Sequence, residues 1–174
     1  MKKLVIDTDA GVDDAQAILL AFGYKDAEIV AFTTVNGNVD VSKTTANVLK
    51  VLDLVGKDVP VYRGCESPLV AEPHHASYVH GEDGLGDCGI PNSKRQPEKK
   101  HAVLALVDLA NENPGQLNLV AIGPLTNLAV ALQLDPDLPK KYADLTIMGG
   151  AIYAKGNTNI TAEFNIFVDP EAAR

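Results

Sequence analysis

Four aspartates near the amino terminus are the first side chains whose types and spacing could do chemistry. Asp7, Asp9, Asp13 and Asp14 stand within eight residues. Crowded carboxylates repel one another unless a cation neutralises them. No Cys or His lies beside them, and hard oxygen ligands favour Ca²⁺ or Mg²⁺ over zinc. The cluster therefore predicts a metal site, although simple helix capping would also explain Asp13 and Asp14.

The cluster lies between a predicted strand and a predicted helix. Residues 3–6 form a short apolar run, and residues 13–22 place Ile18, Leu19 and Phe22 on one side at helical spacing. In an open parallel sheet, ligands bind outside the carboxyl ends of the strands. The aspartates therefore stand where such a sheet would hold a ligand.

The rest of the chain alternates short β-branched runs with helical patterns. This alternation is typical of βαβ units, in which helices cover both faces of a parallel sheet. Further strands are expected at residues 28–35, 59–62, 117–122 and 145–148, and further helices at residues 41–55, 102–111 and 125–134. We therefore expect an α/β fold with an open, mostly parallel sheet, forming a single domain over residues 1–174.

Two stretches do not fit this simple alternation. Residues 64–100 are rich in proline and glycine and too long for a mere connection, so they are either disordered or a functional loop. The histidines in this stretch favour the functional loop.

At the carboxyl end, Asp169 and Pro170 predict the start of a new helix, but the chain stops at Arg174. We therefore expect a truncated domain.

Composition excludes several classes of partner. The net charge of −8 would repel a phosphate backbone, so no nucleic-acid polymer is expected to bind. No apolar run approaches the roughly 18 residues of a membrane helix, so we expect no membrane segment. Cys65 and Cys88 form no CxxC pair. We interpret them as idle thiols of a cytoplasmic protein.

The motif at residues 7–14 (DTDAGVDD) resembles the amino-terminal signature of the inosine-uridine preferring nucleoside hydrolases. Five further motifs resemble that family in the same order, each at a predicted strand end or adjoining loop. They lie at residues 33–38 (TTVNGN), 80–84 (HGEDG), 123–127 (GPLTN), 148–150 (MGG) and 156–172. The resemblance covers the amino-terminal part of the family and implies a Rossmann-like core.

The resemblance also implies an activity, the cleavage of a ribonucleoside by water into ribose and free base. It assigns a Ca²⁺ site to the carboxylates of Asp9 and Asp14 and the backbone carbonyl of Thr126. Asp9 would also act as the base that deprotonates the calcium-bound water. A threonine at a helix start often merely caps it, so capping remains open for Thr126.

The family's substrate-binding residues have counterparts here as well. Asp13 would accept a hydrogen bond from a ribose hydroxyl, and His80 would face the nucleobase. Met148 and Phe164 could wall the pocket, although core packing would explain them equally. The amide and carboxylate groups suited to the sugar hydroxyls are those of Asn38, Asn157, Glu163 and Asn165. Convergence of Asn157 with Glu163 requires a loop that folds back.

Three further expectations follow. The family continues beyond this point with another aspartate ligand and a histidine near the leaving base, so we expect this chain to hydrolyse nucleosides weakly or not at all. Sheet edges left uncovered favour association, and we expect a homo-oligomer. Two rival functions are a nucleoside or ribose binder without turnover and an aspartyl phosphohydrolase, which Asp7-Thr8-Asp9 would suit.

Overall fold

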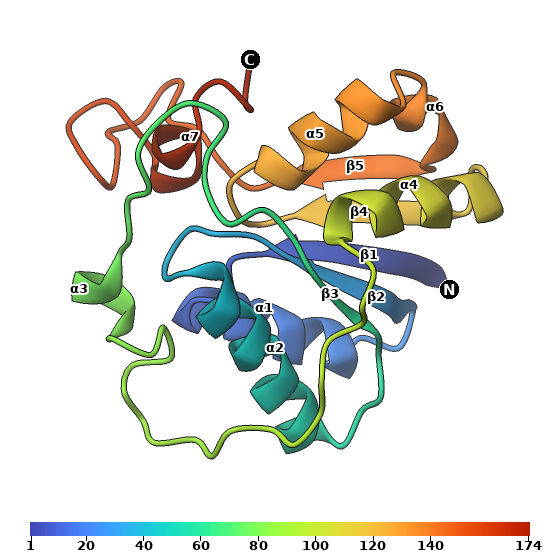
Figure 1. Cartoon of the computed structure of the whole chain (residues 1–174), viewed down its shortest axis with the longest axis horizontal. Helices are drawn as coiled ribbons and strands as arrows, with labels where there is room; N and C mark the ends of the chain where they lie inside the picture. Colours follow the sequence, from blue (N-terminus) through green and yellow to red (C-terminus); the bar gives the residue numbers. More distant parts are fainter.

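The computed structural model describes all 174 residues and alternates strands with helices (Figure 1). The strands are β1 (Lys2–Thr8), β2 (Ala27–Thr34), β3 (Val61–Arg63), β4 (Leu117–Ala121) and β5 (Asp144–Ile147). The helices are α1 (Val12–Gly23), α2 (Val41–Val55), α3 (Ser77–His80), α4 (Ala102–Glu112), α5 (Thr126–Leu134), α6 (Leu138–Lys141) and α7 (Phe164–Val168). Every strand and helix predicted before residue 150 is present, with its bounds within two residues.

The strands form one open sheet in the order β3-β2-β1-β4-β5. Each strand runs parallel to its neighbours. The chain builds outward from β1 to β2 and β3, and then returns to the other side of β1 with β4 and β5. The gap between the carboxyl ends of β1 and β4 is therefore a topological switch point, where open parallel sheets bind ligands.

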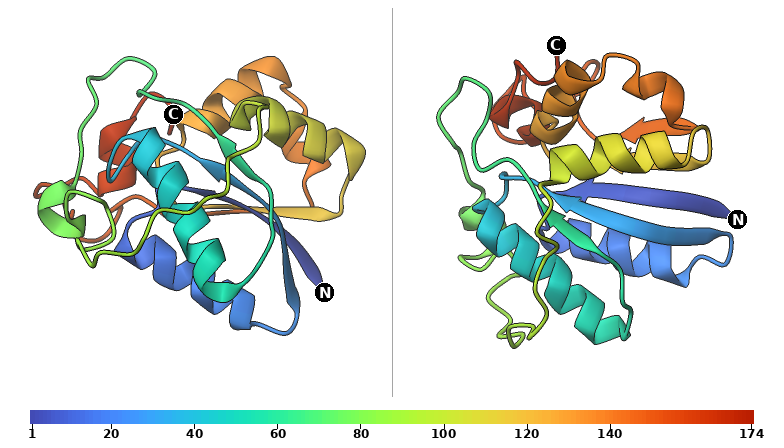
Figure 2. Two further views of the ribbon diagram at one scale, coloured as in Figure 1. Left: turned by 60° about the horizontal axis from the view of Figure 1, so that its bottom comes forward. Right: turned by 45° about the vertical axis from the view of Figure 1, so that its right-hand side comes forward.

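Helices cover both faces of this sheet, as Figure 2 shows. Successive residues of β1 point to opposite faces, so Val5 joins the core beneath α4 and α5, whereas Ile6 joins the core beneath α1 and α2. Each face thus has its own apolar core. The expected doubly covered parallel sheet is confirmed.

Helix α2 shows how the sequence sets the ends of an element. Asp40 accepts hydrogen bonds from the backbone N–H groups of Ser42 and Lys43, which satisfies two free donors of the first turn. Gly56 ends the helix in a left-handed conformation at a φ of 62°. The predicted bounds, residues 41–55, agree with the structure to the residue.

The long segment between β3 and α4 has a defined course. It passes near α7, where the rings of His74 and Phe167 meet edge to face at 5.2 Å, and then forms the short helix α3. It returns past β3, where Tyr62 and Glu98 form an isolated bridge. None of the helices combines the length and apolar character needed to cross a membrane.

The structure differs from the predictions after residue 150. The predicted helix behind Asp169 is wrong: residues 170–173 form a turn, in which the backbone N–H of Ala172 donates to Oδ1 of Asp169 at 3.1 Å. The short helix α7 lies just before it and was not predicted. The strand predicted at residues 145–148 is present as β5, and all four of its residues are exposed.

Candidate active site

A cavity of about 290 Å³ opens at the carboxyl ends of the strands. It is lined by every predicted site residue except Thr126, namely Asp9, Asp13, Asp14, Asn38, His80, Met148, Asn157, Glu163, Phe164 and Asn165. The lining comes from the segments that follow β1, β2, β4 and β5 and from α3. The motifs found far apart in the sequence therefore converge on one place.

Asp9 follows β1 and is completely buried. Its Oδ2 accepts a hydrogen bond of 2.8 Å from the backbone N–H of Asn38, while its Oδ1 is buried without a partner. Gly37 and Gly123 pack against the carboxylate so closely that a Cβ on either would crowd it. Burial, reinforced by the charge of Asp14, holds the pKa of Asp9 well above its usual range.

Asp14 is the second buried carboxyl of the site and also caps α1. Its Oδ1 accepts from the hydroxyl of Thr8 at 2.7 Å, and its Oδ2 accepts from the backbone N–H of Gly11 at 2.9 Å. The amide of Asn38 donates to the same Oδ2 at 3.3 Å, while its backbone binds Asp9. Burial raises the pKa of Asp14 to about 6. Capping is thus a real part of its role.

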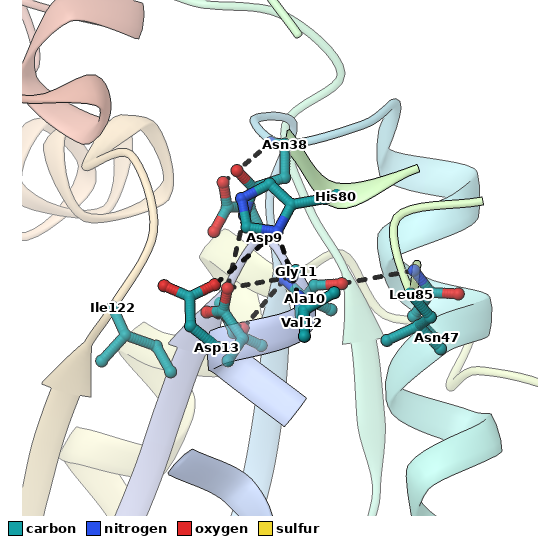
Figure 3. Close-up of polar contacts among 12 residues, drawn as sticks. Asp9, Ala10, Gly11, Val12, Asp13, Asn38, Asn47, His80, Leu85 and Ile122 are labelled. Carbon is teal, nitrogen blue, oxygen red and sulfur yellow. Dashed lines mark hydrogen bonds and ion pairs between the residues drawn. The ribbon is translucent and has the colours of Figure 1, made fainter. Parts of the chain in front are cut away.

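Asp13 and His80 face each other at the cavity rim (Figure 3). Nδ1 of His80 accepts a hydrogen bond of 3.2 Å from the backbone N–H of Val12 and lies 3.9 Å from Oδ1 of Asp13. The His80 side chain is largely buried, whereas 65% of the Asp13 side chain is exposed. Asp13 is therefore free to accept a hydrogen bond from a ligand.

Asp7, the first aspartate of the acidic cluster, does not line the cavity with the other three. Its carboxylate points to the α4 and α5 side of the sheet, where Thr33 and the amide of Asn127 donate to it. The side chains of a strand alternate between faces, and Asp7 points to the same face as Val5. No three His, Cys, Asp or Glu side chains are arranged to hold a metal ion.

The segment after β5 folds back, as the convergence of Asn157 and Glu163 required. The backbone N–H of Asn157 donates to Ala162 at 3.1 Å, and its Oδ1 accepts from Phe164 at 2.8 Å. Glu163 caps α7 by accepting from the backbone of Asn165 and Ile166. Asn165 donates through Nδ2 to the carbonyls of Ile122 and Met148. Nδ2 of Asn157 and Oδ1 of Asn165 remain available to a ligand.

Thr126 lies just outside the cavity, at the first residue of α5. Its hydroxyl donates to Oδ2 of Asp169 at 2.6 Å, and the helix start has no side-chain cap. The capping interpretation of Thr126 is therefore wrong. Asp169, buried and also bound by the backbone of Leu69 at 3.0 Å, is the partner that sequence reasoning missed. It had been interpreted only as a helix cap.

Five lining residues were not predicted: Ala76, Tyr78, Val79, Ile122 and Thr158. Ile122 follows β4 directly, so its position could have been inferred from the strand end. Tyr78 and Val79 belong to the single turn of α3, and nothing in the sequence of the long loop distinguished them from solvated residues.

Asp9 and Asp14 are the residues of this chain that could hold a cation. Two buried carboxyls lie together, and one oxygen of Asp9 has no hydrogen-bond donor. Burial, with a smaller contribution from neighbouring carboxylates, raises the pKa of both groups. A bound cation would stabilise their charged forms, and oxygen-only donors suit a hard cation. The chemistry of these two carboxyls therefore fits the hard cation expected from the sequence.

The chain matches the family model described as inosine-uridine preferring nucleoside hydrolase over residues 4–174. Uridine nucleosidase 1 of Arabidopsis thaliana is 44% identical over 99% of this chain and 52% of its own length. The inosine-uridine preferring nucleoside hydrolase of Crithidia fasciculata is 42% identical over 99% of this chain and 55% of its own length. The chain thus spans about half the length of these curated relatives.

Solved structures agree with these matches. A plant nucleoside hydrolase superposes with a TM-score of 0.95 at 44% identity, covering 99% of this chain and 55% of the other. A purine-preferring ribonucleoside hydrolase from Gardnerella vaginalis superposes equally well, with a TM-score of 0.95 at 36% identity, and covers 99% of this chain and 56% of the other. With the family model matching nearly every residue, the chain belongs to the inosine-uridine preferring nucleoside hydrolase family.

Proposed function

We propose that the cavity binds a ribonucleoside and that water cleaves its N-glycosidic bond at the end formed by Asp9 and Asp14. The observation that carries this proposal is the carboxylate of Asp9. It is buried, directed into a cavity lined by sugar-binding groups, and has one oxygen without a partner. The names of the relatives include uridine, inosine and purine substrates, so what they share is the ribonucleoside and not a particular base.

Calcium is the cation that we propose for Asp9 and Asp14, with the backbone carbonyl of Thr126 as a third ligand. When bound, the ion would supply the positive charge that lowers the pKa of the attacking water. The residues of the chain do the rest. Burial raises the proton affinity of Asp9, so its carboxylate is suited to accept the proton that the water releases.

The lining of the cavity offers groups for both halves of a nucleoside. Glycosidic cleavage passes through an oxocarbenium-like sugar, which needs firmly held hydroxyls. Asp13, Asn38, Asn157, Glu163 and Asn165 offer carboxylate and amide groups to those hydroxyls. Met148 and Phe164 offer apolar surface to the base, and His80, which faces Asp13 at the rim, would also contact it.

The two rival functions receive less support. An aspartyl phosphohydrolase would use Asp7 as its nucleophile, but Asp7 is buried, engaged by Thr33 and Asn127, and absent from the cavity lining. A ribose binder without turnover would use the same cavity, so only an assay separates it from a hydrolase.

We also infer that the chain works in the cytoplasm, since its two thiols are free, and that it forms homo-oligomers.

One panel of assays separates the three functions. The protein is incubated with Ca²⁺ and inosine, uridine or their 5′-monophosphates, and reducing sugar and inorganic phosphate are measured separately. Release of reducing sugar from the nucleosides supports the proposal. Release of phosphate alone would identify a phosphohydrolase, and calorimetric ribose binding without any release would identify a binder. The Asp58→Asn variant, which alters an almost fully exposed carboxylate, is the control.

A further inference from the structure

Ala10 has an unusual backbone conformation in the turn that joins β1 to α1. Its φ is 37°, in the left-handed region, and it is one of only two residues other than glycine with a positive φ. A side chain with a Cβ adopts this conformation at a cost, so the surrounding structure must hold it. Ala10 directly follows Asp9, and its conformation turns the chain so that Asp9 and Asp14 face the same cavity.

Two side chains hold the peptide groups of Ala10. Its N–H donates to the hydroxyl of Thr8 at 3.0 Å, a contact within the same turn. Its carbonyl accepts from Nδ2 of Asn47 at 3.2 Å, and Asn47 belongs to the distant helix α2. Figure 3 shows this amide reaching the turn from the side opposite the cavity.

The same amide nitrogen holds the loop that carries His80. Nδ2 of Asn47 also donates to the carbonyl of Asp83 at 2.8 Å, and a Cβ on Gly84 would lie 2.8 Å from that nitrogen. Asn47 is almost completely buried, and its Oδ1 has no partner. The orientation of the amide is fixed, because a flipped amide would set its oxygen against two carbonyl oxygens.

We propose that Asn47 is a positioning residue that fixes the Ala10 turn and the His80 loop relative to each other. Its two donor hydrogens join segments separated by more than seventy residues, and these segments meet again where the backbone of Val12 donates to His80. Asn47 does not line the cavity and would act only through these two segments. Its importance for catalysis rests on the proposed function, but its effect on the turn does not.

Amide hydrogen exchange followed by NMR tests the proposal without any substrate. Gly11 and Val12 report on the turn, because their N–H groups donate to Asp14 and His80. Asn47→Leu keeps the number and branching of the side-chain heavy atoms and removes both donors. Thr45→Val is the matched control, since it removes a buried hydroxyl of α2 that binds Thr34 and Val41, not the turn.

Asn47→Leu should lower the exchange protection of the Gly11 and Val12 amides by about tenfold relative to Thr45→Val. This is the effect of losing one buried hydrogen bond, the one that Asn47 donates to the carbonyl of Ala10. Ala10→Gly should restore most of that protection in the Asn47→Leu background, because glycine adopts a positive φ without strain. Equal protection in Asn47→Leu and Thr45→Val, or no recovery with Ala10→Gly, would overturn the proposal. If Asn47→Leu does not fold, Asn47→Ser allows the same comparison.

If the proposed function is wrong, the assays and the exchange rates give a different pattern of results. The panel of nucleoside assays would then show no release of ribose, while the exchange rates of Gly11 and Val12 would still respond to Asn47→Leu and Ala10→Gly. If ribose is released, Asn47→Leu should lower the rate and Ala10→Gly should recover it in parallel with the exchange protection. The two ideas can therefore fail separately.

Discussion

At the scale of single residues, burial divides the acidic motif into groups with different chemistry. Asp9 and Asp14 are buried at the cavity, Asp13 is exposed at its rim, and Asp7 is buried on the other face of the sheet. The sequence predicts the crowding of these carboxylates, but not this division. The faces depend on how β1 pairs with β2 and β4, which no local pattern reveals.

Asp7 should make the stability of the protein depend on pH. Burial raises its pKa from 3.8 to about 7, although Thr33 and Asn127 donate hydrogen bonds to it. Between pH 4 and 7 the folded protein therefore keeps a proton that the unfolded chain releases. The stabilisation that protonated Asp7 gives the folded state is fully present below pH 4 and is lost as pH rises to 7. Asp7→Asn cannot ionise and retains an acceptor for both donors.

The free energy of unfolding of Asp7→Asn should therefore rise relative to wild type between pH 4 and 7, by up to about 4 kcal/mol. Urea unfolding of both proteins with chelator at several pH values measures this. Asp9 and Asp14 titrate in both proteins, so their contributions cancel. A difference that does not change with pH would show that Asp7 does not retain a proton on folding.

The two thiols should react at very different rates. Burial, with smaller contributions from the charges of Asp7 and Asp169, raises the pKa of Cys65 to about 11. Only about one thiol in a thousand would be ionised at pH 8, and the thiolate is the nucleophile. Cys88 is exposed, so its thiol should react faster than that of Cys65.

An aromatic disulfide reagent should therefore label Cys88 rapidly, and Cys88→Ser should abolish that fast phase. Loss of the fast phase in Cys65→Ser instead would reverse the assignment.

At the scale of elements, local sequence signals predict the fold well wherever a cap or a periodic pattern is present. Helix α2 has Asp40 before it and Gly56 after it, and its bounds are predicted to the residue. Helix α7 was missed because it has only five residues and is capped by Glu163, a residue type that seldom caps helices. The predicted site residues converge because their motifs end parallel strands.

The supporting residues of the site could not be predicted in this way. Asn47, Asn127 and Asp169 are buried polar residues whose partners lie far away in the sequence, in a turn, in strand β1 and in helix α5 respectively. A helical pattern assigns a side chain to a face of its helix, but it does not show which loop covers that face. Only the assembled sheet brings these partners together.

The turn between β2 and α2 should tolerate no side chain at Gly37. A Cβ there would lie 2.1 Å from Oδ2 of Asp9, whereas a Cβ on Gly23 at the end of α1 would meet nothing within 4 Å. Gly37→Ala should destabilise the protein by about 1–3 kcal/mol through overpacking. Gly23→Ala should change stability by less than about 1 kcal/mol. Urea unfolding of the two variants is the measurement, and equal effects would contradict the packing seen around Asp9.

At the scale of the whole molecule, β5 is the exposed edge of the sheet. Leu145 and Ile147 are 44% and 45% exposed, and Ile152, Tyr153 and Ile160 in the following segment are almost fully exposed. An apolar strand with free backbone groups at a sheet edge is a template for association. The homo-oligomer expected from the sequence therefore has a candidate surface.

Ile147→Lys should shift the protein towards monomer, because a charge at a sheet edge opposes pairing with another chain. Leu20→Lys is the control, since Leu20 is an exposed apolar residue of α1 on a different surface. Size-exclusion chromatography with light scattering at several concentrations gives the mass of each variant. Equal masses for Ile147→Lys and wild type would exclude β5 as the contact surface.

The release of ribose from uridine by wild type and Asp9→Asn is the measurement that tests the account most directly. Both proteins are incubated with Ca²⁺ at high protein concentration for hours, so that a low rate can be measured. We expect release by wild type and by Asp58→Asn, and a rate about 10²- to 10⁴-fold lower for Asp9→Asn, which has lost its base. Release by Asp9→Asn at the wild-type rate would contradict the assignment of Asp9 as the residue that activates water.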